Sequence, residues 1–121
     1  MNENSILNTV KSFLGIMSED KSFDAELIML INTNLPVLAE IGIGPAEGFM
    51  ITGETECWDS LVDLNNLKVL QMVKGFICFR VKVQWDAGSS SSFVVDIWKE
   101  QIKEYEWRLQ AAVDPGKELG V

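Results

Sequence analysis

The sequence predicts a mostly α-helical fold, a small helical bundle of four to five helices with one long loop at about residues 45–56. Apolar residues recur at the i, i+3, i+4 spacing of a buried helix face over four segments. Gly, Pro, Asn or Ser residues stand where these segments would begin or end. The chain has 121 residues, 47% of them hydrophobic, so it can bury one core but is too short for a catalytic domain plus a regulatory one.

We expect a single domain over residues 1–112 and a flexible C-terminal tail over residues 113–121, because Asp114-Pro115-Gly116 cannot continue a helix. No apolar run approaches the roughly 20 residues that span a bilayer, so no membrane segment is expected. The N-terminus lacks the basic and then apolar pattern of a secretory signal, which points to an intracellular origin. The formal net charge of −8 argues against tight DNA binding, because such binding needs Lys and Arg to neutralise phosphates.

The end residues of the first two helices are readable from the sequence. Ser5 can cap a first helix that Gly15 ends. Ser22 is the candidate cap of a second, longer helix that ends at Gly42. Pro36 lies inside this second apolar pattern and should kink or split the helix, because proline removes a backbone donor and clashes with the preceding turn.

The long loop at about residues 45–56 can contain a short extended segment, with Ile51 pinned onto the core. A short helix through Trp58 is expected to follow it. Thr55 is the candidate cap of that helix, because a hydroxyl can accept a hydrogen bond from the free backbone N–H groups of a first turn.

Residues 67–85 fit two patterns. The second half alternates strictly between apolar and polar residues, which is typical of a strand. The whole segment also places its apolar residues on one wide helical arc, and we favour a central helix that begins at Asn65 or Asn66. In a helix, Arg80 falls within the apolar arc and needs a carboxylate or a neighbouring subunit, because burying an unpaired charge is costly.

Residues 92–109 predict a helix with aromatic side chains on two opposite sides. At about 100° per residue, Trp107 points away from the apolar stripe and lies among Glu100, Glu104 and Arg108. A solvent-facing Trp in so small a chain favours a partner surface, because Trp is enriched where proteins meet. The alternative is that Trp107 packs beneath the first helix of its own chain. The apolar stripe itself consists of Val94, Val95, Trp98, Ile102, Tyr105, Leu109 and Val113.

The residue inventory argues against catalysis and against a bound cofactor or metal. The chain has no histidine, so the usual zinc ligand sets and a Cys-His nucleophile cannot be assembled. No P-loop and no nucleophile-elbow motif is present. Glu56, Asp59 and Asp63 could form only a weak cation site, and such carboxylates usually lie in solvent. We expect no enzymatic activity.

Three segments in a fixed order carry a family resemblance over most of residues 5–110. They are Ser22-Phe23-Asp24 with a helix ending in Ile41-Gly42-Ile43-Gly44-Pro45, then Gly48-Phe49-x-Ile51-Thr52 with Trp58-Asp59, and Ser92-Phe93-Val94 through Lys103-Glu104-x-Glu106-Trp107-Arg108-Leu109. In these segments the chain resembles the small head-tail connector proteins, also called adaptors or head-completion proteins, of long-tailed double-stranded DNA phages. One departure is local, since members of this family often carry prolines where this chain has Ala87-Gly88 and serines.

The resemblance implies a structural virion protein that forms a ring of about a dozen copies below the portal of the filled head. In that role it would extend the DNA channel, let DNA pass without sequence-specific binding, and provide the docking surface for the next connector or the tail. The expected partners are other copies of the chain, the portal protein, and a downstream connector or tail-completion protein. The expected location is the head-tail junction of the virion, and the bacterial host cytoplasm during assembly.

Four residues are expected at a subunit interface: Arg80, Phe93, Trp107 and Arg108. The alternative function is a small cytoplasmic regulatory module of phage or prophage origin that binds a protein partner. A stable monomer or dimer that never forms rings with the portal protein would favour this alternative.

Overall fold

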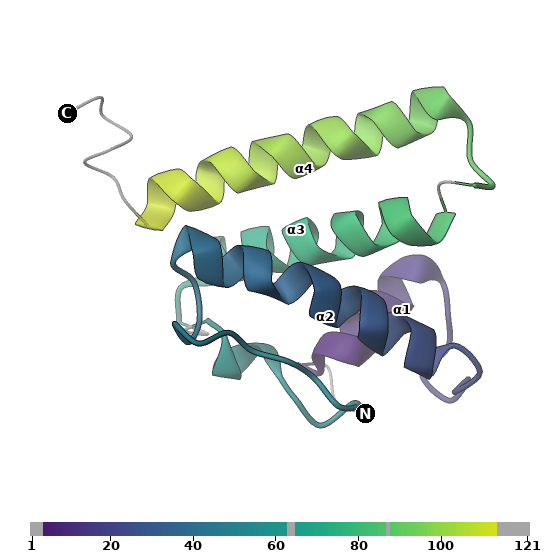
Figure 1. The fold of residues 1–121 in the computed structure, drawn as a ribbon, viewed down its shortest axis with the longest axis horizontal. Helices are drawn as coiled ribbons and strands as arrows, with labels where there is room; N and C mark the ends of the chain where they lie inside the picture. Colours follow the sequence, from purple (N-terminus) through teal and green to yellow (C-terminus); the bar gives the residue numbers. More distant parts are fainter. Residues whose placement is uncertain (1–3, 63–64, 87, 114–121) are drawn as a thin grey trace.

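The computed structural model describes residues 4–62, 65–86 and 88–113. Along these residues lie four α-helices and one short 3₁₀ helix: α1 (Ile6–Leu14), α2 (Asp24–Ile41), η1 (Trp58–Ser60), α3 (Leu67–Asp86) and α4 (Ser92–Val113). Helix α3 is central, because it packs against each of the other α-helices. Figure 1 shows α2 in front of α3 and α4 along one edge of the molecule. The predicted helical bundle is confirmed.

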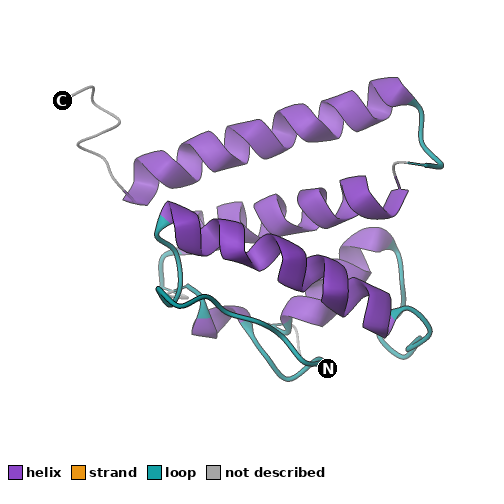
Figure 2. Cartoon of the chain, viewed as in Figure 1, coloured by secondary structure: helices purple, strands orange, loops and turns teal. Residues whose placement is uncertain are grey.

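The described residues contain no β-strand, and Figure 2 shows only helices and loops. One isolated antiparallel bridge within this part of the chain joins Ser5 to Cys57. Beside it, the backbone N–H of Trp58 donates to the carbonyl of Asn4 at 2.9 Å. The start of α1 is therefore fixed against the end of the long loop.

Helix α1 begins and ends as the sequence predicts. The Ser5 hydroxyl accepts a hydrogen bond from the backbone N–H of Asn8 at 3.2 Å, which satisfies one of the free donors of the first turn. Gly15 ends the helix with a φ of 81°, a left-handed conformation that glycine adopts without the Cβ penalty.

Helix α2 differs from the prediction at its start, and of the two outcomes predicted at Pro36 the split does not occur. Ser22 does not cap it, because the helix begins at Asp24 after Phe23, and the backbone N–H of Ser22 instead donates to the Asp20 carboxylate at 3.0 Å. Pro36 does not split the helix, which runs unbroken from Asp24 to Ile41. Packing on the core outweighs the loss of one backbone donor.

A buried lysine connects α1, the loop after it and the start of α2. The Lys11 side chain is fully buried, and its ammonium donates to the carbonyls of Ser18 (3.1 Å) and Asp20 (2.6 Å) and to the carboxylate of Asp24 (2.8 Å). An ammonium has three donors, and all three are used. This cluster, rather than a cap by Ser22, sets where α2 begins.

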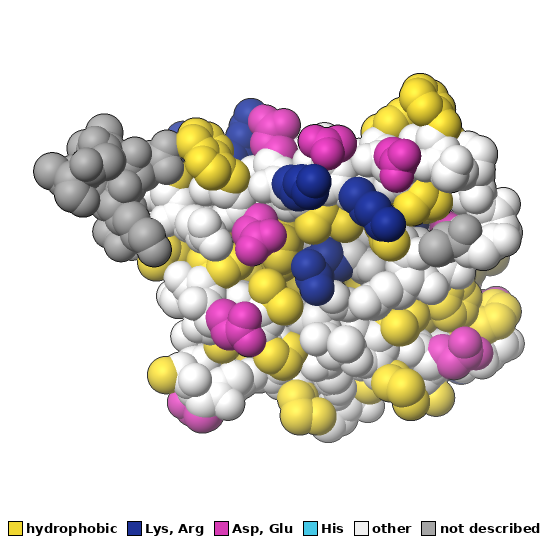
Figure 3. Space-filling view, turned by 45° about the horizontal axis from the view of Figure 1, so that its top comes forward, with side chains coloured by type: hydrophobic (Ala, Val, Ile, Leu, Met, Phe, Trp, Pro, Cys, Tyr) yellow, Lys and Arg dark blue, Asp and Glu magenta, His cyan; other side chains and the backbone are white. Residues whose placement is uncertain are grey.

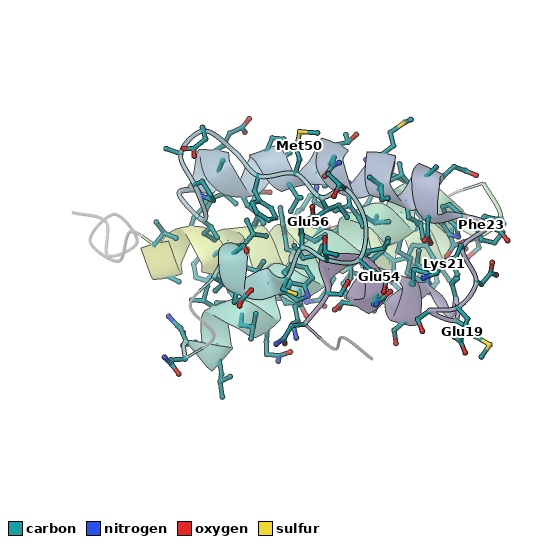
Figure 4. The ribbon with its side chains drawn as sticks, turned by 90° about the horizontal axis from the view of Figure 1, so that it is seen from below. Glu19, Lys21, Phe23, Met50, Glu54 and Glu56 are labelled. Atoms are coloured by element: carbon teal, nitrogen blue, oxygen red, sulfur yellow. The ribbon has the colours of Figure 1, made fainter. Side chains whose placement is uncertain are left out.

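The long loop lies on the core as predicted, although it forms no strand. Ile51 is buried, and its backbone N–H and carbonyl both bond to the side-chain amide of Asn32 on α2, at 2.8 and 2.9 Å. Figure 4 labels Lys21 and Glu54, whose exposed ion pair of 2.6 Å joins this loop to the loop before α2. Met50 stays 66% exposed.

The end of the long loop corrects a second predicted cap. Thr55 does not cap the short helix, because η1 begins after Cys57 and has no side-chain cap. The carboxylate of Glu56 instead fixes the loop by accepting from the Thr52 hydroxyl at 2.6 Å and from the Gly53 backbone N–H at 3.3 Å. These hydrogen bonds, the Thr52 hydroxyl first, lower the pKa of Glu56 to about 2.

Residues 67–86 form a helix, so the strand pattern in their second half did not decide the structure. The Asn66 side chain accepts from the backbone N–H of Val69 at 3.3 Å, as expected of a cap. Before α4, the Ser91 hydroxyl accepts from the backbone N–H of Val94 at 3.2 Å. Both α3 and α4 therefore begin after a polar side chain that caps the helix and that can be recognised in the sequence.

The core lies between α1, α2 and α3, with the long loop and η1 closing it below. Its largest member is Trp58, which is fully buried and donates its indole N–H to the Thr9 hydroxyl at 3.0 Å. Helix α4 supplies Val95 and Leu109 as its buried residues. The tail predicted at residues 113–121 lies outside the described residues except for Val113, which is the last residue of α4.

Replacing Lys11 by Met should destabilise the protein by about 3 kcal/mol, because two carbonyls and a carboxylate lose their buried donor. The free energy of unfolding in urea measures this effect. The control is Lys21→Met, which removes only an exposed ion pair and should leave the unfolding midpoint unchanged. Equal midpoints for both variants would contradict the role assigned to Lys11.

Candidate functional site

Helix α4 lies on the rest of the protein along one stripe. Its inner side packs on α3 through Val95, Ile102, Tyr105 and Leu109. The contact with α3 is close at Gly75, where an added Cβ would lie 2.5 Å from the Tyr105 ring. The helix therefore has one covered side, as the sequence predicted.

The opposite side of α4 carries large apolar residues in solvent. Phe93 is 73% exposed, Ile97 is 52% exposed and Trp107 is 59% exposed. These residues share one side, since they are four and ten positions apart at about 100° per residue. Figure 3 shows hydrophobic side chains near both ends of this upper surface, with charged side chains between them. We call Phe93, Ile97, Trp107 and the charged residues between them the outer face of α4.

The charges on the outer face are mostly acidic, and two of the acids are paired within the helix. Arg108 donates to Glu104 at 2.6 Å, and Lys103 lies 3.5 Å from Glu100. Exposed pairs of this kind add only a few tenths of a kcal/mol to helix stability. Charges of this kind matter more for the choice of partner than for stability, because a partner with like charges opposite them is repelled.

The exposure of Trp107 settles one alternative. The residue does not pack beneath α1 of its own chain, because more than half of its surface lies in solvent. Tryptophan is enriched where proteins meet, so an exposed Trp107 is a candidate for contact with a partner. Phe93 and Arg108 are exposed on the same helix, so three of the four predicted interface residues lie along α4.

Arg80 does not join them, and its partner differs from the one expected. Its Nε–H donates to the side-chain oxygen of Asn34 at 2.7 Å, and its guanidinium lies 5.4 Å from the centre of the Phe76 ring. The amide of Asn34 in turn donates to the Leu30 carbonyl and to Gln84. A buried amide of the same chain, and not a carboxylate, therefore bonds to the Nε–H of Arg80 between α2 and α3. Contact of Arg80 with a neighbouring subunit stays a prediction.

The Cys78 thiol is buried on α3. Burial raises the pKa of the Cys78 thiol to about 12, so it carries no thiolate at neutral pH. Among the described residues, no group of three His, Cys, Asp or Glu side chains could hold a metal ion. Of the three predicted weak cation ligands, Asp63 lies outside the described residues. The same part of the chain has no helix long and apolar enough to cross a membrane.

Sequence reasoning missed a second surface, a groove of about 890 Å³ bounded by α1, α3 and the middle of α4. Phe13, Phe79 and Tyr105 line it with aromatic rings, and Lys74 lies among them. The rings come from three helices far apart in the sequence, so no local pattern reveals them. Ile97 was also missed, although its spacing from Phe93 could have shown it.

These features define a class of protein: over the described residues, a small helical bundle with large apolar side chains exposed on its last helix. A family model described as phage connector protein matches residues 6–116. The chain belongs to this family of phage connector proteins, which are structural components of the virion. No curated protein and no solved structure matches the chain significantly.

The exposure of Trp107 can be checked by acrylamide quenching of tryptophan fluorescence. Trp58 is buried and Trp85 and Trp98 are half-buried, so Trp107 should be the most readily quenched of the four. Trp107→Phe should lower the quenching constant of the free chain, and Trp98→Phe should change it little. A quenching constant that Trp107→Phe leaves unchanged would contradict an exposed outer face.

Proposed function

We propose that this connector protein forms a ring below the portal of the filled head, extends the DNA channel, and provides the docking surface for the next connector or the tail. It acts by association and catalyses no reaction. The outer face of α4 is its contact with a neighbouring subunit of the head-tail junction, through Phe93, Trp107 and Arg108. Arg80 supports this contact indirectly, because its hydrogen bond to Asn34 joins α2 to α3.

The observation that carries this proposal is the exposure of Phe93 and Trp107 on a helix that packs on the core by its other side. Tryptophan and arginine are the residues in which interface energy concentrates, and Trp107 lies one position from Arg108. The pair formed by Glu104 and Arg108 holds the guanidinium in place before a partner arrives. Pre-ordered side chains lower the entropic cost of association.

The charge of the chain supports the proposed relation to DNA. The net charge is −8, and the two bases among the first 66 residues are both paired with acids, Lys11 with Asp24 and Lys21 with Glu54. Phosphate binding depends on available Lys and Arg, so DNA can move past such a surface without being retained. A protein that gripped DNA tightly would hinder its passage through the channel.

Electron microscopy of the full chain mixed with its portal protein tests the proposal. A ring of this chain stacked on the portal is the expected result. A chain that remains a monomer or dimer beside free portal rings would overturn the proposal and would favour a small regulatory module.

Trp107→Ala should weaken joining to the head by at least about tenfold, because truncating a central interface Trp commonly costs more than 1 kcal/mol. The measurement is the fraction of heads that carry the connector after incubation with the variant. Met50→Ala is the matched control, because Met50 is equally exposed but lies on the long loop rather than on α4. Equal joining by Trp107→Ala and Met50→Ala would contradict the role of the outer face.

A further inference from the structure

The groove between α1, α3 and α4 offers an apolar and basic surface that the rest of the described chain does not cover. Phe13 stays 39% exposed on its rim, beside the half-buried rings of Phe79 and Tyr105. Lys74 has no acidic partner within the described residues, and Glu19, the one acid in the lining, bonds to Ser18 at the far end of α1. The groove fits an occupant with apolar and acidic side chains.

A buried polar atom in the same groove also lacks a partner. The side-chain oxygen of Asn8 lies in the lining, is shielded from solvent, and accepts no hydrogen bond from any described residue. Buried acceptors are nearly always bonded in complete structures. The groove therefore has an uncovered aromatic rim in a single copy of the chain, with one unpaired polar atom in its wall.

The outer side of α2 has the complementary composition. Helix α2 contains three acidic residues and no basic residue. Glu26, Met29 and Glu40 are exposed, and Met29 is 69% exposed with its long apolar side chain in solvent. The stripe that they share consists of Ala25, Glu26, Met29, Thr33, Pro36 and Glu40. We call this stripe the α2 ridge.

The α2 ridge and the groove lie on opposite sides of the subunit. Figure 4, seen from below, places α2 along one edge and α1 with the start of α3 along the other. On α3 itself, Arg80 and Gln84 bond to α2, whereas Gln71, Lys74 and Cys78 line the groove from a different side of the helix. When the two contact faces lie on opposite sides of a subunit, each copy is rotated only slightly relative to the next. A ring built from such contacts closes only after many copies.

We propose that the α2 ridge of one copy packs into the groove of the next copy, and that this contact is the lateral interface of the ring. The inference rests on the proposed connector ring and adds the two faces that build it. Met29 inserts between the aromatic rings, and Glu26 or Glu40 pairs with Lys74. Because the two faces differ, the contact is heterologous and self-propagating.

The outer face of α4 is a weaker candidate for the same groove. It carries larger apolar residues, but α4 itself contributes Tyr105 to the lining of the groove, whereas no residue of α2 lines it. The outer face of α4 then serves the separate contact in the head-tail junction that is proposed above.

Two single variants disable one face each without touching the core. Met29→Lys places a cation on the ridge opposite Lys74, and Ser12→Trp fills the groove from an exposed position on α1. Each variant should lower the yield of rings on portal by at least about tenfold. An equimolar mixture of the two should form 1:1 pairs, because only one intact ridge and one intact groove remain to meet. Native mass spectrometry measures both results.

Asp59→Lys is the matched control, because it reverses an exposed charge on η1 away from both faces and should form rings normally. Carbodiimide cross-linking of wild-type rings built from isotope-labelled and unlabelled copies is a second measurement that needs no variant, and it should join Lys74 to Glu26 or Glu40 between copies. Wild-type rings with no such cross-link, and with Met29→Lys and Ser12→Trp assembling normally, would overturn this inference alone. Absence of wild-type rings would overturn it together with the proposed function.

Discussion

The rest of the structure depends on how α4 is attached. Helix α3 lies at the centre and is covered by α1, α2 and α4, while α4 has only α3 as an extended neighbour. Gly75 permits this close attachment, because any side chain there would collide with Tyr105. A 22-residue helix held along one stripe leaves its other side to solvent. Since that side carries Phe93, Ile97 and Trp107, the fold itself creates the surface that a virion neighbour can cover.

Much of the fold could be predicted, because the periodicity of a helix and many of its end residues are visible in the local sequence. Ser5, Gly15, Gly42 and Asn66 all act where their residue types suggest. The start of α2 could not be predicted from Ser22, because it depends on Lys11, which reaches across 13 residues to Asp24. Core packing likewise holds α2 together through Pro36, so the proline does not split the helix.

The interaction surfaces divide in the same way. Helical geometry within α4 places Trp107 opposite the apolar stripe, but the sequence left open whether the first helix covers it, and the structure shows it 59% exposed. The partner of Arg80 did not follow, because Asn34 lies 46 residues away on another helix. The groove is formed by Phe13, Phe79 and Tyr105, which come from three different helices. The acidic α2 ridge can be interpreted as a contact surface only once its position opposite that groove is known. Relations between distant elements are what the structure adds.

The central claim is that the outer face of α4 is open in the free chain and covered in the virion. Hydroxyl-radical footprinting of the free chain and of assembled head-tail particles tests it most directly. The account predicts that oxidation of Trp107 and Phe93 falls strongly on assembly, while buried Trp58 stays protected in both states. Equal oxidation of Trp107 and Phe93 in the free chain and in the particle would contradict it.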